Sequence, residues 1–344
     1  MSLQINRQVV LASRPDGRPQ ANNFAIAEAP IHTPGDGQVL SKTIYLSLDP
    51  YMRGRMNAGK SYADPVEIDE VMSGGTVGQV IESKNSGFSA GDFVFGYGGW
   101  QEFWLQDGKK LKKVDPQLAP ISTATGVLGM PGVTAYTGLL NIGQPKKGET
   151  VVVAAASGAV GSVVGQIARI KGTRVVGIAG TPEKCEFVTE ELGFDACVNH
   201  SRQDFAENLK SACPNGIDVY FENVGGKVFE KVLPLLNNFS RIPVCGVISS
   251  YNATQLPAGP NLTPLLMRYI LVKRLTFRGF IVWDFDSQEE EALTQLSNWI
   301  KEGKIRYRED IVDGLENAPE AFMGLLEGKN FGKLVVRVSD EPAG

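Results

Sequence analysis

The stretch from Val151 to Ser162 constrains the fold more than any other part of this sequence. It begins with Val151-Val152-Val153-Ala154-Ala155, an apolar and mostly β-branched run of strand length. Gly158 and Gly161 follow, and one face of a helix is then formed by Val160, Val163, Val164, Ile167 and Ala168. Two glycines between a strand and a helix let a pyrophosphate approach the backbone at the positive end of the helix. The stretch predicts a dinucleotide site, with Ala155 where the first glycine usually stands.

The residues after this turn favour a cofactor site over an ordinary buried turn. Buried strand-to-helix turns are often rich in glycine and alanine, so the motif alone is weak. Here a second β-branched run, residues 173–179, follows the predicted helix directly. Strand, turn, helix and strand together form the βαβ unit that a dinucleotide motif requires.

The end of the second strand indicates which dinucleotide is bound. NAD sites usually place an acidic residue there for the ribose 2′-hydroxyl, but this strand closes with Gly177-Ile178-Ala179-Gly180-Thr181. Lys184, at the start of the next predicted helix, could reach a 2′-phosphate, although a solvated surface lysine is the ordinary alternative. The missing acid favours NADP over NAD.

Length and composition set the broad class of protein. A chain of 344 residues exceeds one ordinary core, so we expect two domains. The hydrophobic content of 42% and charged content of 21% are those of a globular protein. The net charge of −4 comes without a basic stripe, which disfavours nucleic acid as a partner. No apolar run approaches membrane-spanning length and the first residues do not resemble a signal peptide, so a cytoplasmic location is expected.

The cysteines and histidines do not have the spacing of a metal site. Cys185, Cys197, Cys213 and Cys245 are scattered without a Cys-x-x-Cys pair, and the chain has two histidines. A zinc ion would need several ligands from remote positions, so no metal is expected. The cysteines are interpreted as small buried hydrophobic residues.

The regions on either side of the central motif differ in pattern. Residues 1–125 contain short strand-like runs between Gly, Pro, Asp and Asn turns, which predicts a β-rich domain. A helical turn at residues 48–56 interrupts it and carries Tyr51, either as part of a connector or as a phenol offered to a cleft. A helix at residues 126–140 is expected to bridge the domains, and the last strand-like run, residues 330–338, to return to the first domain.

After the central motif, strands and helices alternate. Strands are predicted at residues 217–221, 240–245 and 275–282, and this alternation predicts a doubly wound parallel sheet. Their tips at residues 222–226, 246–252 and 283–284 should line the nicotinamide half of the site, because ligands bind at the carboxyl ends of such strands. Ser287-Gln288-Glu289-Glu290 has the pattern of a capping box that opens a further helix.

Several longer motifs occur in order along the chain: Leu48-Asp49-Pro50-Tyr51-Met52-Arg53, Gly129-Met130-Pro131-Gly132-Val133-Thr134-Ala135-Tyr136, Glu222-Asn223-Val224-Gly225-Gly226, Ser250-Tyr251-Asn252 and Asn330-Phe331-Gly332-Lys333. They resemble the zinc-independent branch of the medium-chain dehydrogenase/reductase superfamily that holds prostaglandin and alkenal reductases, and within it the bacterial curcumin reductase-like members. Zinc-dependent relatives carry Gly-His-Glu where this sequence has Met72-Ser73-Gly74-Gly75, which agrees with the metal-free expectation.

This resemblance implies a fold and an activity. The fold is α/β, with a GroES-like β-rich domain of residues 1–125 and 308–344 and a Rossmann domain of residues 126–307. The activity is the NADPH-dependent reduction of the carbon–carbon double bond of α,β-unsaturated ketones and aldehydes. Relatives are often dimers joined through edge strands of the nucleotide domain, and the apolar residues 242–244 and 270–272 allow a homodimer here.

The resemblance also implies cofactor contacts. Met130 and Thr134 would touch the nicotinamide, the glycines of the turn the pyrophosphate, and Lys184 the 2′-phosphate. The residues expected to line the cofactor are Met130, Thr134, Gly158, Ala159, Val160, Gly161, Gly180, Lys184, His200, Asn223, Cys245, Tyr251, Phe280 and Asn330. Family members often place a tyrosine on the 2′-phosphate where this sequence has His200, and a histidine there adds pH dependence.

Hydride addition to an enone requires a hydrogen-bond donor more than a nucleophile. Negative charge develops on the carbonyl oxygen when hydride reaches the β-carbon, so a donor beside that oxygen lowers the barrier. Tyr251 and Tyr51 are the candidate catalytic residues, with a turn tyrosine stacked on the adenine or ribose as the alternative for Tyr251. A quinone reductase of the same fold and a non-catalytic NADPH-binding regulator remain the alternative functions.

Overall fold

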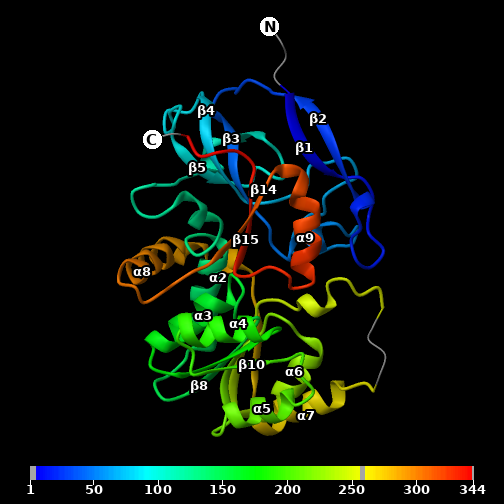
Figure 1. The fold of residues 1–344 in the computed structure, drawn as a ribbon, viewed down its shortest axis with the longest axis vertical. Helices are drawn as coiled ribbons and strands as arrows, with labels where there is room; N and C mark the ends of the chain where they lie inside the picture. The colour runs from blue at the N-terminus through cyan, green and yellow to red at the C-terminus, as the bar shows by residue number, and fades with distance from the viewer. Residues whose placement is uncertain (1–4, 256–259, 343–344) are drawn as a thin grey trace. The chain divides into compact units, whose positions relative to one another are not determined.

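The computed structural model describes residues 5–255 and 260–342 and divides the chain into two compact units (Figure 1). Of the described residues, those within 1–126, 309–330 and 334–344 form the first unit. Those within 127–308 and 331–333 form the second. Part of the N-terminal stretch compared with a signal peptide, residues 1–4, lies outside the described residues. None of the described helices has the length and apolar character needed to span a membrane.

The first unit is β-rich, as the sequence predicted. β1 (Ile5–Leu11) pairs antiparallel with β2 (Phe24–Pro30). The larger sheet of the described chain has the order β14-β15-β3-β4-β5-β7, with β6 also paired to β3. Its strands are β3 (Gln38–Ser47), β4 (Thr76–Ser83), β5 (Phe93–Gly96), β6 (Phe103–Asp107), β7 (Lys112–Lys113), β14 (Glu309–Asp313) and β15 (Lys333–Arg337). β15 pairs antiparallel with β3, which confirms the predicted return of the C-terminal strand.

An aromatic cluster fixes the core of this unit. The rings of Phe24 and Trp100 stack with centroids 5.8 Å apart, and Trp100 meets Phe322 of α9 (Ala318–Leu326) edge-on at 5.6 Å. The short helix α1 (Met52–Arg55) is anchored to the same cluster, because Met52 and Met56 are fully buried in it. This anchoring fixes the backbone of Tyr51, the residue immediately before α1.

The second unit contains the predicted doubly wound sheet. Among the described residues, six parallel strands have the order β10-β9-β8-β11-β12-β13. They are β8 (Thr150–Ala154), β9 (Arg174–Ala179), β10 (Ala196–Asn199), β11 (Ile217–Phe221), β12 (Leu236–Val244) and β13 (Thr276–Gly279). The helices of this unit are α2 (Met130–Thr137), α3 (Gly161–Ile170), α4 (Pro182–Glu186), α5 (Phe205–Ala212), α6 (Gly226–Val232), α7 (Thr263–Lys273) and α8 (Glu289–Lys301). The strand order reverses between β8 and β11, and ligands of doubly wound sheets bind at such a switch point.

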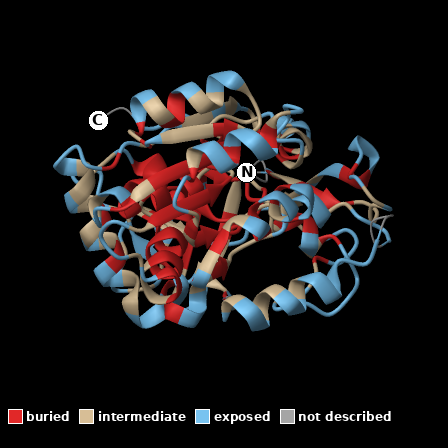
Figure 2. Cartoon of the chain, turned by 90° about the horizontal axis from the view of Figure 1, so that it is seen from below, coloured by how far each residue is buried: buried red, intermediate tan, exposed pale blue. Residues whose placement is uncertain are grey.

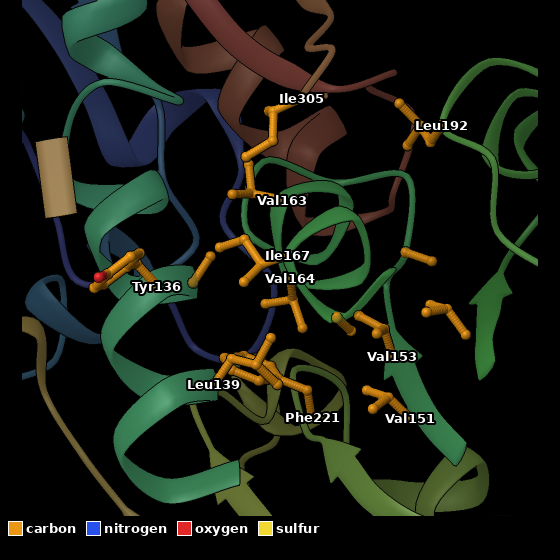
Figure 3. Close-up of a cluster of buried hydrophobic side chains, with 14 of the residues drawn as sticks. Tyr136, Leu139, Val151, Val153, Val163, Val164, Ile167, Leu192, Phe221 and Ile305 are labelled. Carbon is orange, nitrogen blue, oxygen red and sulfur yellow. The ribbon is translucent and has the colours of Figure 1, made fainter. Parts of the chain in front are cut away.

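The sheet is covered on both faces. Alternate residues of β8 belong to two different clusters, Val151 and Val153 to one and Val152 and Ala154 to the other. All five residues of this strand are buried, and buried residues are red in Figure 2. Figure 3 shows the first cluster, in which Val163, Val164 and Ile167 of α3 pack with residues of β8 and β11. Burying each such side chain stabilises the fold by about 1.5–3 kcal/mol, so α3 is held firmly on the sheet.

The predicted capping box at Ser287 is wrong. A 3-10 helix, Val282–Gln288, occupies that stretch, and α8 begins at Glu289 after Gln288 with no side-chain cap. The Asp284 carboxylate accepts a hydrogen bond from the Ile281 N–H at 2.9 Å instead. The helical path therefore starts several residues earlier than the capping pattern indicates.

Two other expectations need correction. Residues 242–244 were expected to allow a subunit interface, but they lie in β12, which pairs with β11 on one side and β13 on the other. β13 and β10, at the two ends of the strand order, are the edges instead. Residues 331–333 were expected to belong to the first domain, but they cluster with the second unit because Gly332 forms a bridge with Gly158 and the Lys333 N–H bonds to the Arg308 carbonyl.

Candidate functional site

The turn after β8 has the geometry of a pyrophosphate cradle. Ala155 adopts a left-handed conformation with φ +51°, which places it among the few described non-glycine residues with positive φ. A Cβ atom on Gly161 would lie 2.3 Å from the Ala155 carbonyl oxygen, so only glycine fits there. α3 begins at this glycine with no side chain capping its first turn. Its N–H groups and the positive end of its dipole therefore face the turn, as an anion site requires. These residues fit a dinucleotide.

Residues 331–333 lie beside the same turn. Gly332 bridges Gly158, and a Cβ on Gly332 would come within 2.2 Å of the Arg308 carbonyl oxygen. The rings of Phe331 and Phe187 meet edge-on with their centroids 4.9 Å apart. The Arg308 guanidinium lies 3.9 Å from the centroid of the Phe331 ring. Residues 331–333 of the motif Asn330–Lys333 therefore lie against the glycine turn, and the Arg308 guanidinium lies on the Phe331 ring.

Gly180, Lys184 and His200 meet at the ends of β9 and β10. The Nε2 atom of His200 lies 3.3 Å from the position that a Cβ on Gly180 would take. Partial burial lowers the pKa of the His200 imidazole, and the charge of Lys184 lowers it further. The backbone N–H of Lys184 donates to the Thr181 hydroxyl at 3.3 Å, which fixes the first turn of α4. The structure therefore brings together two of the residues predicted for a 2′-phosphate.

Glu222 holds the tip of β11, a role that the sequence analysis missed. It is buried, and its Oε1 accepts hydrogen bonds from the Val224 N–H at 2.7 Å, the Gly225 N–H at 2.8 Å and the Tyr220 hydroxyl at 3.1 Å. Burial raises the pKa of this carboxyl group, while the donated hydrogen bonds lower it. One carboxylate oxygen thus fixes the glycine-rich turn after the strand.

The same tip joins its neighbours through Glu222 and Asn223. The Glu222 carbonyl accepts from the N–H groups of Cys245 and Gly246, which follow β12. The Asn223 side-chain amide donates to the Ala154 carbonyl at 2.8 Å, one residue before the strained Ala155. Three strand tips of the sheet are therefore held in one hydrogen-bonded brace. The signal in the sequence was an acidic residue opening the glycine-rich motif, but its partners could not be known.

The residues predicted for the nicotinamide end occupy different environments. Thr134 is buried on α2 and its hydroxyl donates to the Met130 sulfur at 3.6 Å, so these two lie together. The Phe280 side chain is buried against Gly138 and the rings of Phe221 and Phe285, which makes it part of the core. Burial raises the pKa of the Cys245 thiol to about 12, so this thiol is uncharged.

The two candidate catalytic tyrosines belong to different units. In the second unit, the Tyr251 hydroxyl oxygen accepts from the Val247 N–H at 3.4 Å, which places it at the tip that follows β12. In the first unit, burial holds the pKa of Tyr51 well above its usual range, and the Asp49 carboxylate raises it further. Tyr51 is therefore a neutral phenol at physiological pH. Asn330, half-buried after α9, also belongs to the first unit.

No group of three or more His, Cys, Asp or Glu side chains in the described ranges is arranged to hold a metal ion. The Cys213 thiol is buried, and the other cysteines are partly buried.

Comparisons with known proteins agree on one family. A family model described as the N-terminal domain of oxidoreductase matches residues 7–114, and one described as zinc-binding dehydrogenase matches residues 159–299. The NADPH-dependent curcumin reductase of Escherichia coli is 58% identical over 98% of each chain. Prostaglandin reductase 1 of Rattus norvegicus is 43% identical over 94% of this chain and 96% of the relative. The 2-alkenal reductase (NADP(+)-dependent) of Nicotiana tabacum is 42% identical over 98% of each.

A solved structure gives the same answer for the fold. The crystal structure of CurA in complex with NADPH from Vibrio vulnificus matches with a TM-score of 0.94 and 56% sequence identity, over 97% of this chain and 100% of that one.

Removing the Glu222 carboxylate is expected to loosen the brace. Glu222→Ala leaves two buried N–H groups and a buried hydroxyl without their acceptor, which costs at least about 3 kcal/mol of unfolding free energy. Glu222→Gln keeps an acceptor oxygen and should lose much less. Because the pKa is raised in the folded chain, the wild type should also lose stability relative to the Gln variant as pH rises above about 4.5. Denaturant unfolding across pH tests both points, and equal losses for Ala and Gln would contradict the brace.

Binding of NADPH is expected to depend on the protonation of His200. Its pKa is lowered in the free protein, so a nearby phosphate dianion should raise it and draw in a proton on binding. The affinity for NADPH relative to NADH should therefore fall as pH rises from 5.5 to 7.5, and this slope should flatten in His200→Gln. Fluorescence titrations of both cofactors measure it. Arg202→Gln, which removes a nearby cation paired with Asp204, should keep the slope; equal slopes in His200→Gln and the wild type would refute the role of His200.

Proposed function

The chain belongs to the medium-chain dehydrogenase/reductase superfamily, and we propose that it catalyses the NADPH-dependent reduction of the carbon–carbon double bond of α,β-unsaturated ketones and aldehydes. The observation that carries this proposal is the full-length similarity to relatives named curcumin reductase, prostaglandin reductase and 2-alkenal reductase. The glycine turn and its uncapped helix supply the cofactor site that such a reaction needs.

The chain's own residues divide the work of binding. NADPH, when bound, supplies the hydride. The backbone of Gly158, Ala159, Val160 and Gly161 holds the pyrophosphate at the start of α3, because N–H groups and the helix dipole meet there. Gly180, Lys184 and His200 hold the 2′-phosphate. Asn223, Cys245, Met130 and Thr134, with the backbone at Phe280, would line the rest of the cofactor site in the second unit.

Catalysis then needs one donor at the carbonyl oxygen of the substrate. A positioned hydroxyl stabilises the negative charge that develops on this oxygen as the β-carbon accepts hydride, and the α-carbon is protonated afterwards. We assign this donor role to Tyr251, since its hydroxyl stands at a strand tip next to the brace. Tyr51, whose raised pKa keeps it protonated, is the second candidate donor.

A homodimer in the cytoplasm is part of the same proposal. β13 ends the sheet and is mostly exposed, and the preceding α7 exposes 59% of Met267, 76% of Leu271 and 57% of Val272. Unpaired edges and apolar patches of this kind favour association with a second copy. The four cysteines are free thiols, as is usual in a reducing compartment.

Turnover on a substrate panel tests the activity. Loss of NADPH absorbance should be fast with enones and enals, give the saturated carbonyl, and be much slower with NADH. Tyr251→Phe should lower kcat about 100-fold while the KM for NADPH stays within twofold, because only the oxyanion donor is lost. Tyr51→Phe serves as the matched control and should lose less. Turnover of quinones alone, or NADPH binding with no turnover, would overturn the proposal; a raised KM with unchanged kcat in Tyr251→Phe would instead make Tyr251 a cofactor contact.

Solution mass tests the dimer. The wild type should have the mass of two chains by light scattering, and Leu271→Glu should shift it toward one chain because it buries a charge in the apolar interface. Lys210→Glu changes the charge on α5, which follows β10 at the opposite end of the strand order from β13, and should leave the mass unchanged. A wild type with the mass of a single chain would end the dimer proposal.

A further inference from the structure

Two cysteines from different elements meet in the second unit. Cys185 lies on α4, and Cys197 lies on β10 opposite Gly177 of β9. The Cys197 sulfur is 3.1 Å from the position that a Cβ on Gly177 would take, and Val188, just beyond α4, reaches 2.9 Å from the same point. The Cys197 sulfur thus lies on the sheet face covered by α4 and by the π-helix that follows it, Phe187–Glu191. The two thiols are hydrogen-bonded to each other.

The pair differs chemically from the other two cysteines. The hydrogen bond from Cys197 lowers the pKa of the half-buried Cys185 thiol. The same bond, and then burial, raises the pKa of Cys197. Burial raises the pKa of both Cys213 and Cys245 to about 12, which leaves those thiols unreactive. Cys185 therefore has the character of an attacking thiol, with Cys197 beside it as the resolving thiol.

The pair also adjoins the residues proposed for the 2′-phosphate. Cys185 directly follows Lys184, and β10, which carries Cys197, leads into His200. His200 stands against Gly180, and the Lys184 charge acts on its imidazole. Because Lys184 lies on α4 and His200 directly follows β10, a shift of α4 against β10 changes the separation of these two residues.

We propose that Cys185 and Cys197 are a modification site that hydrogen peroxide oxidises to an intramolecular disulfide, and that the disulfide weakens NADPH binding. The effect on NADPH binding rests on the proposed function. The Cys185 thiolate attacks one peroxide oxygen, the O–O bond breaks, and a sulfenic acid forms as the first water leaves. The Cys197 thiol then attacks that sulfur and a second water leaves. In total, two thiols and one peroxide give one disulfide and two waters, a two-electron oxidation of the thiols.

The expected effect on the cofactor follows from the length of the new bond. A disulfide is about 2.05 Å long, which is much shorter than the separation of hydrogen-bonded thiols. Closing it draws the single turn of α4 toward β10 and displaces Lys184 from the place that Thr181 fixes for it. NADH has no 2′-phosphate, so its binding should change little.

Hydrogen peroxide and mass mapping test the site on the full-length protein. After treatment, thiol alkylation and digestion, we expect a cross-linked peptide containing Cys185 and Cys197 and a loss of 2 Da, while Cys213 and Cys245 remain alkylated after unfolding. Fluorescence titration should show at least a fivefold weaker Kd for NADPH, an unchanged Kd for NADH, and full recovery with a dithiol reductant. Cys185→Ser should abolish all of these effects, and the matched Cys213→Ser should keep them.

The experiments test the disulfide, its effect on NADPH binding and the proposed function separately. Absence of the cross-link in oxidised wild type overturns the inference, and so does a cross-link that leaves the NADPH Kd unchanged. Neither readout uses turnover. A protein that forms the cross-link and loses NADPH affinity, yet reduces no enone, would refute the proposed function and leave the modification site standing.

Discussion

The candidate cofactor site depends on the close approach of Gly161 to the Ala155 carbonyl. The 2.3 Å left for a Cβ atom shows that α3 begins as near to the end of β8 as a backbone can. This approach holds Ala155 in a left-handed conformation, which costs an alanine about 1–2 kcal/mol. The cost is offset by burial of the α3 face on the sheet, where Val163, Val164 and Ile167 lie in the core. Packing of α3 on the sheet thus positions the N–H groups at the start of α3 toward the cofactor site.

The strands were predictable where burial set their composition. A parallel strand covered on both faces is an unbroken apolar run, and β8, with all its residues buried, has that pattern. β14, with the sequence EDIVD, has no such signal, because three of its five residues are charged, one of its two apolar residues, Ile311, is exposed, and its partner β15 comes from a later part of the chain. The helix start predicted at Ser287 was wrong for a related reason. Polar side chains in neighbouring positions compete to bond the backbone at the start of a helix. Here the Asp284 carboxylate accepts from the Ile281 N–H, so the helical segment begins before Ser287.

The site divides in the same way between local and long-range features. The glycine turn and the absence of an acid after β9 are local, so the sequence alone indicated a dinucleotide and favoured NADP. The function of Glu222 depends on Tyr220 beneath it and on two other strand tips, and no spacing in the sequence encodes those partners. The meeting of Cys185 with Cys197 requires α4 to fold over β10, so four scattered cysteines gave no hint of a pair.

The parts of the site differ in how firmly the fold holds them, and this difference bears on regulation. The pyrophosphate turn is fixed by a ten-residue helix whose inner face is fully buried. The 2′-phosphate end rests on α4, a five-residue helix in which no residue is buried. Its start is fixed by the Thr181 cap, and it continues into a π-helix, Phe187–Glu191, in which Phe187 and Val188 are buried. The exposed first turn of α4 therefore loses less packing when it is displaced than α3 would, while Phe187 and Val188 hold the helical segment that follows it. Selectivity for the 2′-phosphate can therefore be adjusted at Cys185 and Cys197 while the grip on the pyrophosphate stays intact, and an oxidised protein would still bind a dinucleotide but discriminate less between its two forms.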